Sequence, residues 1–513
     1  MPLWGKMVLF CCICGRRYEC SVGNTSKGYV KQACCSHPCL AEKDWRETLS
    51  TMGKDYYPDP RKETNPMTDK AQKLMIVDDL SPEDVAMLQA LYSRSSESAE
   101  AHIEKVKQSG SGKFMSSFYV GYGHKSIADC GSTTMFIENV SLLAAKAIQD
   151  WPLYSGQETS TRYIDMSKQR IVDPIGTVLS KSILDDWMNF YTSNQDRVAA
   201  TVKEKHPIKE GEKPETYEKA VKARAFDILR GFLPAGITTQ LSWHTNLRQA
   251  GDHLTFLKKH PLPEISNIAE GLGNLAAVNY PSSGFEQSLA TVSGVGQKDE
   301  EANQARAAWE QMFGELIAYP KPLVAGEQIS LEMRGFENYR LYSNMLSSRP
   351  RGCVLPHFLS DIGQLTFRFL LDFGSFRDIQ RHRNGVCRMP MLETFWGFEQ
   401  WYLDQLDDEL REEARQLIEI QAGKIRAISK DALPRQYYVA LGFRVPTQVT
   451  YSLPAAVYVM ELRSGKHIHP TLRKKVQDMA KLFSGHFTDI PLHVDTDEDD
   501  WTVRRGLQTI TQK

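Results

Sequence analysis

The sequence predicts a mixed α/β (α+β) protein in which two tandem copies of one fold form a pseudo-dimer, behind a small metal-binding N-terminal module. Three observations support this prediction. The chain has 513 residues, enough for about three domains. Seven of its ten cysteines lie within the first 39 residues. Two apolar segments, residues 133–149 and the aromatic-rich residues 364–380, resemble each other in their order of residues.

Four segments are expected along the chain. Residues 1–50 form a cysteine-rich head, and residues 51–79 form a polar, proline-containing linker. The first large domain is expected over residues 80–290 and the second over residues 303–513. The interval 282–302 is rich in Gly, Ser and charged residues, which is typical of a domain boundary.

The first large domain is expected to begin with a helix. Ser81 is a preferred cap, Pro82 suits the first helical turn, and Glu83 adds an acid behind it. The amphipathic pattern continues to about Ile103.

A second helix is predicted over residues 133–149, stopped by Pro152. A polar loop over residues 155–165 and helices over residues 215–232 and 264–277 follow. In residues 133–149, apolar residues on one helical face are spaced at steps of four, three and four, namely Phe136, Val140, Leu143 and Ala147.

The second large domain is predicted to contain helices over residues 303–318, 364–380 and 397–428. The middle helix repeats the four, three, four step in Phe369, Phe373, Phe376 and Gln380. At an offset of 231, the residues that match between the two domains are Phe136 with Phe367, Ile148 with Ile379 and Gln149 with Gln380.

Composition excludes several classes of protein. Lys and Arg total 62 and Asp and Glu total 63, so a globally basic nucleic-acid coat and an acidic tail protein are excluded. Hydrophobic residues make up 41% of the chain, which excludes wholesale disorder. The apolar run at residues 7–12 is too short to cross a bilayer, and no secretory signal pattern follows it. We therefore expect a soluble, cytoplasmic protein without membrane contact.

Three motifs carry a resemblance to a known family. They are "YGHKSIAD" at 122–129, "DWPLYSGQETSTRY" at 150–163 and "FRDIQRHRNGVCRMPMLE" at 376–393. Together they resemble the G-H-x-S and R-H-R-x-x-S-x-N-x-x-S-x-R motifs of flavin-dependent thymidylate synthases. The resemblance is good over residues 80–280 and distant over residues 330–490, apart from the motif.

The two copies of the long motif have complementary losses. The first copy has Asp150-Trp151-Pro152 in place of Arg-His-Arg but keeps Ser155, Gln157 (for Asn), Glu158, Ser160, Arg162 and Tyr163. The second copy keeps Arg381-His382-Arg383, with Arg377 upstream, but has Val386, Arg388, Met391 and Glu393 at the later positions. The family's distal Asn-x-Arg is present as Asn246 and Arg248, and its Leu-Arg as Leu462 and Arg463.

The resemblance implies two tandem thymidylate-synthase-complementing-like domains that share one composite site. Because the family forms homotetramers, it also implies a homodimer that mimics a tetramer. The implied reaction is FAD-dependent transfer of a one-carbon group to C5 of dUMP, with methylenetetrahydrofolate as donor and NADPH as reductant. The residues implied to hold FAD are His124, Ser126, Gln157, Asn246, Arg381, His382 and Arg383.

Substrate recognition can also be argued from the residue types. Ser160 and Arg162 alternate along an extended loop and offer two donors to a phosphate dianion. Arg463 suits a uracil carbonyl oxygen on which charge develops when C5 acts as nucleophile, so Arg463 and Ser160 are the catalytic candidates. Glu158 would take a sugar hydroxyl or hold an arginine, and Arg377 and Arg381 would add contacts to the substrate. The family needs no cysteine nucleophile, and Cys387 is expected in the core.

The cysteine-rich head resembles a treble-clef zinc finger. Its expected ligands come as two close pairs, which suits tetrahedral zinc, namely Cys11, Cys14, Cys35 and Cys39. Arg16 and Arg17 permit contact with nucleic acid.

Two alternatives stay open. The first is a related flavin-dependent modification of dUMP at C5 with another donor or product. The second is a non-catalytic, zinc-finger nucleic-acid-binding protein with a degenerate synthase body.

Overall fold

The computed structural model describes residues 74–95, 97–115, 117, 125–285, 328–498 and 501, and a few residues between 304 and 312. Nearer the N-terminus it describes the backbone of three strands. The chain forms two compact units, Met1–Asp78 and Asp79–Lys513.

The N-terminal unit contains an antiparallel sheet with strand order β1-β2-β3. Its strands are β1 (Gly5–Phe10), β2 (Arg17–Thr25) and β3 (Gly28–Lys31). The predicted zinc ligands lie outside the described residues, so the zinc finger stays a prediction.

The predicted helix start at Ser81 is confirmed. α2 (Pro82–Tyr92) follows Ser81, whose Oγ accepts a hydrogen bond from the Asp84 amide at 3.2 Å. The helix ends earlier than predicted, because residues 93–95 and 97–98 are not helical. The elements that follow are α3 (Ala99–Ser109), α4 (Gly112–Phe114) and η3 (Lys125–Cys130).

The single helix predicted over residues 133–149 is wrong. Its first part is a strand, β4 (Ser132–Ser141), and only the last part is a helix, α5 (Leu142–Gln149). Burial alternates along the strand, since Thr133 and Ile137 are buried while Phe136 is 75% exposed. This period of two, with several β-branched residues, favours a strand and outweighs the weaker match to a helical face.

The prediction for residues 364–380 is wrong in the same way. β7 (Gln364–Asp372) is followed by α14 (Phe373–Ile379). In each half the last strand residue caps the helix, since Ser141 Oγ accepts from the Ala144 amide at 3.0 Å and Asp372 Oδ1 accepts from the Ser375 amide at 2.9 Å. A cap with extended backbone allows a strand to pass directly into a helix.

The elements after this strand and helix also recur in the same order. β4 pairs antiparallel with β5 (Thr238–Asn246), and β7 pairs antiparallel with β9 (Arg444–Ser452). A turn precedes each partner strand and two helices follow it. In the first half these are η4 (Arg230–Phe232), α9 (Leu247–Leu257) and α10 (Pro263–Asn279), and in the second half η7 (Gln436–Tyr438), α18 (Leu453–Arg463) and α19 (Pro470–His486).

Two offsets relate the halves. α5 begins at Leu142 and α14 at Phe373, which is an offset of 231. β5 begins at Thr238 and β9 at Arg444, which is an offset of 206. The intervening connection is therefore longer in the first half.

A β-bulge corrects the predicted match of Phe136 with Phe367. The register of β4 shifts between Glu138 and Val140, where Asn139 has a φ of 57°. Ahead of the bulge, Phe136 lies opposite Ser242, and its counterpart opposite Gln448 is Arg368. Phe367 is fully buried, unlike Phe136. Behind the bulge the predicted matches of Ile148 with Ile379 and of Gln149 with Gln380 agree in burial.

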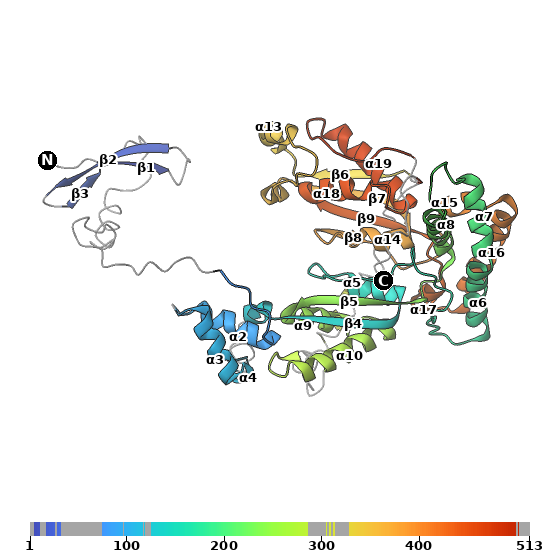
Figure 1. Cartoon of the computed structure of the whole chain (residues 1–513), viewed down its shortest axis with the longest axis horizontal. Helices are drawn as coiled ribbons and strands as arrows, with labels where there is room; N and C mark the ends of the chain where they lie inside the picture. The colour runs from blue at the N-terminus through green and yellow to red at the C-terminus, as the bar shows by residue number, and fades with distance from the viewer. Residues whose placement is uncertain are drawn as a thin grey trace. The chain divides into compact units, whose positions relative to one another are not determined.

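The remaining helices of the first half are α6 (Val178–Ser193), α7 (Gln195–Lys205) and α8 (Pro214–Leu229), and those of the second are α13 (Ser343–Ser347), α15 (Gln400–Asp404), α16 (Asp408–Ile428) and α17 (Ala432–Arg435). Helices α6, α7, α8 and α16 gather at one end of the larger unit (Figure 1). The helices predicted over residues 215–232 and 264–277 are thus confirmed, and residues 397–428 form two helices. Most of residues 303–318 lie outside the described residues.

The second-half sheet has the strand order β6-β7-β9-β8. It includes β6 (Ser330–Arg334) and β8 (Gly385–Arg388), and the turns η5 (Tyr339–Tyr342) and η6 (His357–Asp361) precede β7.

Reciprocal backbone hydrogen bonds join the two halves. The Ala235 amide donates to the Val439 carbonyl at 2.9 Å, and the Leu441 amide donates to the Leu233 carbonyl at 2.8 Å. A second pair runs from Gly236 to Tyr437 and from Gly442 to Gly231, each at 2.7 Å. Within each pair of bonds, the donor of one bond is related to the donor of the other by the offset of 206, and the same holds for the two acceptors.

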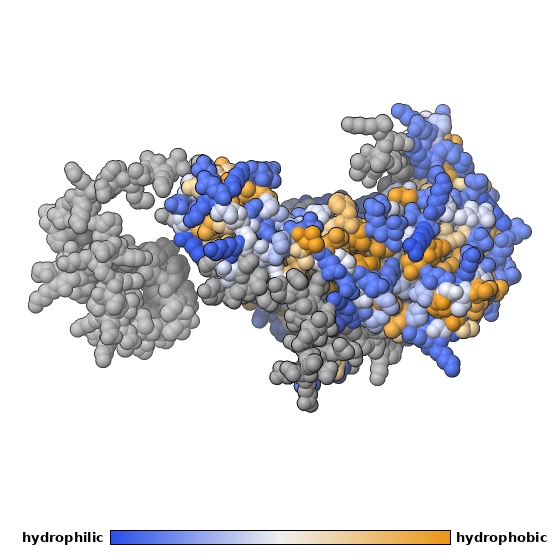
Figure 2. All heavy atoms as spheres, turned by 90° about the horizontal axis from the view of Figure 1, so that it is seen from below, coloured by the Kyte–Doolittle hydropathy of each residue, from blue (hydrophilic) through white to orange (hydrophobic). Residues whose placement is uncertain are grey.

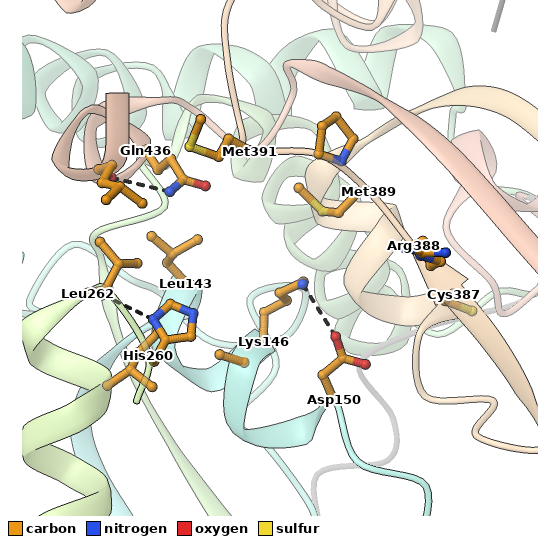
Figure 3. Close-up of a pocket in the computed structure, with 14 residues that line it drawn as sticks. Leu143, Lys146, Asp150, His260, Leu262, Cys387, Arg388, Met389, Met391 and Gln436 are labelled. Carbon is orange, nitrogen blue, oxygen red and sulfur yellow. Dashed lines mark hydrogen bonds and ion pairs between the residues drawn. The ribbon is translucent and has the colours of Figure 1, made fainter. Parts of the chain in front are cut away.

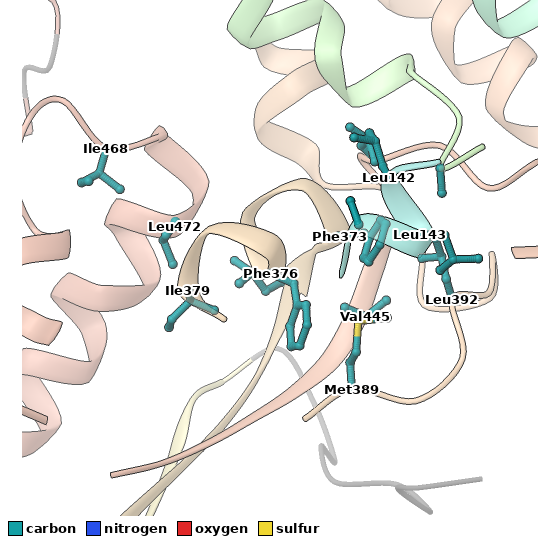
Figure 4. Packing of buried hydrophobic residues seen from close by; sticks show 14 of the residues in the cluster. Leu142, Leu143, Phe373, Phe376, Ile379, Met389, Leu392, Val445, Ile468 and Leu472 are labelled. Carbon is teal, nitrogen blue, oxygen red and sulfur yellow. The ribbon is translucent and has the colours of Figure 1, made fainter. Parts of the chain in front are cut away.

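One hydrophobic core runs through both halves. Leu142 and Leu143 of α5 lie close to Phe373 of α14 (Figure 4). No helix in the described part of the chain is long and apolar enough to cross a membrane. On the face seen in Figure 2, hydrophobic residues are interspersed with hydrophilic ones.

Candidate functional site

The loop after α5 lies beside β5 as an additional edge segment. The His244 amide donates to the Ser155 carbonyl at 2.7 Å, and the Ser242 amide donates to the Gln157 carbonyl at 2.9 Å. Adjacent side chains of such an extended segment point to opposite faces, so Gln157 is exposed while the Glu158 side chain is only 1% exposed. β8 occupies the same place beside β9 in the second half.

Glu158 joins the first half to the second. Its carboxylate accepts hydrogen bonds from Gln149 Nε2 at 2.7 Å, from Arg377 Nη2, and from Arg381 Nη2 at 3.4 Å. Arg377 is buried, and burial lowers the pKa of its guanidinium while Glu158 acts in the opposite direction. Arg381 is 38% exposed, so its outer edge reaches solvent.

Arg162 is held by a buried carboxylate. Its Nε and Nη2 donate to the two oxygens of Asp227 at 2.6 and 3.2 Å, and Nη1 donates to the His467 carbonyl at 3.3 Å. Burial acts to lower the pKa of Arg162, but Asp227 raises it above its ordinary value. Ser160 lies next to this pair, because its Oγ accepts from the Arg162 amide at 3.2 Å.

Arg463 and His382 form a second contact at the site. Arg463 Nε donates to His382 Nε2 at 2.5 Å, and Arg463 Nη2 donates to the Asp378 carbonyl at 3.1 Å. Burial, followed by the repulsion from Arg463, lowers the pKa of His382 to about 3. The imidazole is therefore neutral at physiological pH, with its proton on Nδ1 because Nε2 is the acceptor.

Four guanidinium groups act electrostatically on the Asp378 side chain. Arg230, which is almost fully buried, donates to Asp378 Oδ2 at 3.5 Å. Burial acts to raise the pKa of Asp378, but Arg230, Arg381, Arg162 and Arg463 together lower it well below its ordinary value. We use the name arginine cluster for these four arginines together with Arg377 and Arg383.

Arg383 completes the arginine cluster at the end of α5. Its Nε donates to the Gln149 carbonyl at 2.9 Å, and its guanidinium lies over the Tyr154 ring at 4.5 Å from the ring centre. Tyr154 in turn donates to the Ser242 carbonyl at 2.6 Å. The arginine of one half is thus seated on an aromatic ring of the other.

The arginine cluster has more donors than acceptors. Its six arginines outnumber the carboxylates that pair with them, which are those of Glu158, Asp227, Asp372 and Asp378. Two buried nitrogens, Arg377 Nε and Gln380 Nε2, have no hydrogen-bond partner within the described part of the chain. Such a surplus of donors suits a phosphate or diphosphate group, which brings acceptor oxygens and negative charge.

Other predicted site residues are not brought to the arginine cluster by any recorded contact. Asn246 caps α9, because its Oδ1 accepts from the Gln249 amide at 2.8 Å. Ser126 lies in η3 and is exposed. His124 is outside the described residues. Among the residues that the structure describes, no group of three or more His, Cys, Asp or Glu side chains is arranged to hold a metal ion.

The motifs did not identify Asp227, Arg230 and Asp378. A signal for two of them is present in "AFDILRGFL", where an acid and an arginine three residues apart interrupt an otherwise apolar run. Charged residues in such a run are almost never fully buried unless they are paired. Asp378 lies between Arg377 and Arg381, within the motif segment itself.

Comparison with known proteins links the first half to a family. Residues 75–282 match the family model described as thymidylate synthase complementing protein. The UPF0159 protein of Chlamydia muridarum is 25% identical over 70% of this chain and 76% of its own length. The UPF0159 protein of Thermoplasma acidophilum is 24% identical over 75% of this chain and 90% of its own length. The family match implies an enzyme of the thymidylate synthase type, with nucleotide biosynthesis as its setting.

Proposed function

We propose that the protein transfers a one-carbon group to C5 of dUMP in an FAD-dependent reaction, at a composite site to which both halves contribute. The observation that carries this proposal is the arginine cluster, in which contacts cross between the halves: Glu158 of the first half accepts from Arg377 and Arg381 of the second, and Arg162 of the first half donates to the His467 carbonyl of the second. The family match over residues 75–282 supports the same reaction type. The proposed carbon donor is methylenetetrahydrofolate and the proposed reductant is NADPH.

The proposed role of Ser160 and Arg162 is to bind the nucleotide phosphate. Asp227 and the His467 carbonyl take three of the five N–H donors of the Arg162 guanidinium, which fixes the plane of the group and leaves two donors. A guanidinium held in this way loses less side-chain entropy when it binds a phosphate. Glu158 is buried and bound to two arginines, so we assign it to orienting Arg381 rather than to a sugar hydroxyl.

Arg463 is proposed to donate to a uracil carbonyl oxygen. That oxygen carries negative charge in the enolate form of the ring that makes C5 nucleophilic. Formation of the bond from C5 to carbon then discharges the oxygen, and the C5 proton is lost later. The contact of Arg463 with the Asp378 carbonyl and with neutral His382 fixes its direction. Donors that are oriented before the reaction stabilise developing charge without further rearrangement.

The residues proposed to hold FAD are Arg381, His382 and Arg383, with Gln157 at the edge of the loop. Arg381 is proposed to contact the nucleotide substrate as well. The donor surplus around them fits the diphosphate of a dinucleotide. FAD supplies the redox chemistry when it is bound, while the protein supplies binding and orientation. His124, Ser126 and Asn246 stay in this proposal on the family resemblance alone.

The larger unit is proposed to be a pseudo-dimer that arose by tandem duplication. The proposal is supported by the recurring order of strands and helices at offsets of 231 and 206 and by the reciprocal hydrogen bonds between residues 231–236 and 437–442. A homodimer would then mimic a tetramer. Structural zinc in the head is a separate proposal, tested by measuring the metal content of the purified chain and its loss in Cys14→Ser.

Flavin content tests the proposed reaction directly. The purified full chain is expected to be yellow, to lose its flavin absorbance when NADPH is added without oxygen, and to convert dUMP into a product heavier by one CH₂ when methylenetetrahydrofolate is present. A product of different mass would indicate another donor or group. A colourless protein that takes up neither FAD nor dUMP would refute the proposal and leave the non-catalytic binding protein.

Two variants test the composite nature of the site. Arg162→Ala and Arg381→Ala are each expected to abolish dUMP turnover, because each removes a guanidinium of a different half. The matched control is Arg415→Ala, which changes a surface arginine on α16 that is 52% exposed and is expected to retain full activity. Full activity in either site variant would contradict the pairing of the halves.

A further inference from the structure

A pocket at the end of α5 is built from the same kinds of elements as the arginine cluster. The end of α5 from the first half and residues 387–391 from the second half line it, together with His260 and Gln436 (Figure 3). Its volume is about 90 Å³. The arginine cluster combines the end of α14 from the second half with residues 155–162 from the first, so the two places have the same construction with the halves exchanged.

The residues at the two helix ends correspond one to one. α5 and α14 are related by the offset of 231, and their capping residues obey the same offset. The pairs at this offset are Lys146 with Arg377, Ala147 with Asp378 and Asp150 with Arg381. The pocket therefore lacks the central carboxylate and has an acid where the arginine cluster has its most exposed arginine.

The facing loops correspond as well. Ser155 lies opposite His244 of β5, and Val386 lies opposite Thr450 of β9, which are equivalent positions of the two strands. This register gives the same offset of 231 as the helices. The pairs that follow are Met389 with Glu158, Met391 with Ser160 and Glu393 with Arg162.

The remaining residues of the pocket correspond to residues of the arginine cluster at the offset of 206. Leu433 and Gln436 line the pocket at the positions that Asp227 and Arg230 occupy in the arginine cluster. The acid that orients Arg162 and the buried arginine that contacts Asp378 are both replaced by uncharged residues. Three separate segments thus agree that the pocket is the counterpart of the arginine cluster.

The replacements remove the means of binding a phosphate. Lys146 is already paired with Asp150, at 3.5 Å between Nζ and Oδ2, as the dashed line in Figure 3 marks. Glu393 has the opposite charge to Arg162 and is itself paired with Arg435 at 2.8 Å. Arg388 also lines the pocket, but the thioethers of Met389 and Met391 replace the carboxylate of Glu158 and the hydroxyl of Ser160.

The small volume of the pocket also argues against nucleotide binding there. Pockets for drug-sized ligands have volumes of roughly 300 Å³ or more. A nucleotide would not fit into about 90 Å³ unless the methionine side chains moved away.

We propose that the chain binds one nucleotide, at the arginine cluster, and that the pocket beside α5 is the counterpart site closed by substitution. This inference rests on the proposed function and specifies its stoichiometry. A pseudo-dimer with two equal composite sites would have arginines in both places. In this chain the arginines are present at one of the two places only.

The test is to titrate the purified, flavin-containing full chain with dUMP by calorimetry and to count the bound nucleotide by equilibrium dialysis. One dUMP per chain is expected. Two variants change equivalent positions, one in the arginine cluster and one in the pocket. Arg381→Ala is expected to raise the Kd for dUMP at least roughly tenfold, because a charge-assisted contact is lost. Asp150→Ala, whose side chain is 45% exposed, is expected to change neither the Kd nor the stoichiometry.

The outcomes separate this inference from the function on which it rests. Two dUMP molecules per chain would overturn the inference and leave the proposed function in place, as would equal weakening by Asp150→Ala and Arg381→Ala. A chain that binds no dUMP and no flavin would overturn the proposed function, and the inference with it. Thermal melting of both variants shows that a loss of binding is not a loss of folding.

Discussion

Buried acids orient the arginines of the candidate site. Asp227 holds Arg162 through two oxygens, and Glu158 holds Arg377 and contacts Arg381. A guanidinium that is out of water needs such a partner, because an unpaired buried charge is very costly. The acids therefore matter to stability as well as to the direction in which each arginine points.

Glu158→Gln tests this dependence. The change leaves the buried guanidinium of Arg377 without a carboxylate, and we expect the free energy of unfolding to fall by about 3 to 5 kcal/mol. Urea denaturation measures it. The double variant Glu158→Leu with Arg377→Met removes both charges and is expected to be more stable than Glu158→Gln, although inactive. Equal stability of Glu158→Gln and the unchanged protein would contradict the role of the pair.

Three histidines with lowered pKa values predict the pH dependence of stability. Burial lowers the pKa of His253 and of His260 to about 4, and that of His382 to about 3, from an ordinary value of 6.5. The unfolded chain therefore takes up protons below pH 6.5 that the folded chain refuses, so stability falls as the pH falls from 6.5 towards 4. Melting temperatures between pH 6.5 and pH 5 are expected to decrease. His260→Asn, which cannot titrate, is expected to make this decrease smaller, and an unchanged slope would contradict the assignment.

At the level of elements, a strand followed by a helix was predicted as one helix in both halves, and the reason is physical. Residues 133–149 and 364–380 each combine a strand and a helix without a break, joined by Ser141 or Asp372. Apolar residues at spacings of three and four occur in both kinds of element when the strand is short and the helix follows at once. The capping residue is the local signal that separates them.

The bulge in β4 offers a prediction for one element. Asn139 is exposed and has a φ of 57°, a left-handed conformation that β-branched residues adopt only at a cost of roughly 1 to 2 kcal/mol. Asn139→Val is therefore expected to lower the free energy of unfolding by about that amount. Asn139→Gly serves as the control, because glycine adopts positive φ readily. Equal stability of the two variants in urea denaturation would show that the bulge tolerates any residue.

At the level of the whole larger unit, the junction between the halves is continuous with the core. Trp187 of α6 donates through Nε1 to the Tyr438 carbonyl of the second half at 3.0 Å. The reciprocal hydrogen bonds around Gly236 and Gly442 cross the same junction. The arginine cluster depends on this junction, because its members come from both sides.

Gly236→Ala tests the closeness of the junction. A Cβ at this position would lie 2.8 Å from the Val172 carbonyl oxygen and 2.9 Å from that of Tyr437, so backbone must shift, and we expect a loss of about 1 to 3 kcal/mol in the free energy of unfolding. The matched control is Gly271→Ala in α10, where a Cβ meets nothing within 4 Å and where alanine is the better helix former. Similar melting temperatures for both variants would contradict a tight junction.

The sequence by itself determined the residue types of the candidate site and the places where several helices begin. Ser81 and Pro82 marked a helix start, and the complementary losses in the two motif copies predicted a site shared by Arg162 and Arg381. These features are local in the chain, so periodicity, capping residues and motif spacing carry them.

Only the tertiary structure decided which residues stand beside one another. Strand register and the packing of the halves determine three features that the sequence did not reveal. These are the partners Asp227, Arg230 and Asp378, the one-residue register shift at Asn139 and the pocket at Asp150. The physical reason is that burial and pairing arise between segments far apart in the chain, as with Glu158 and Arg377. No periodicity or spacing within either segment records that contact.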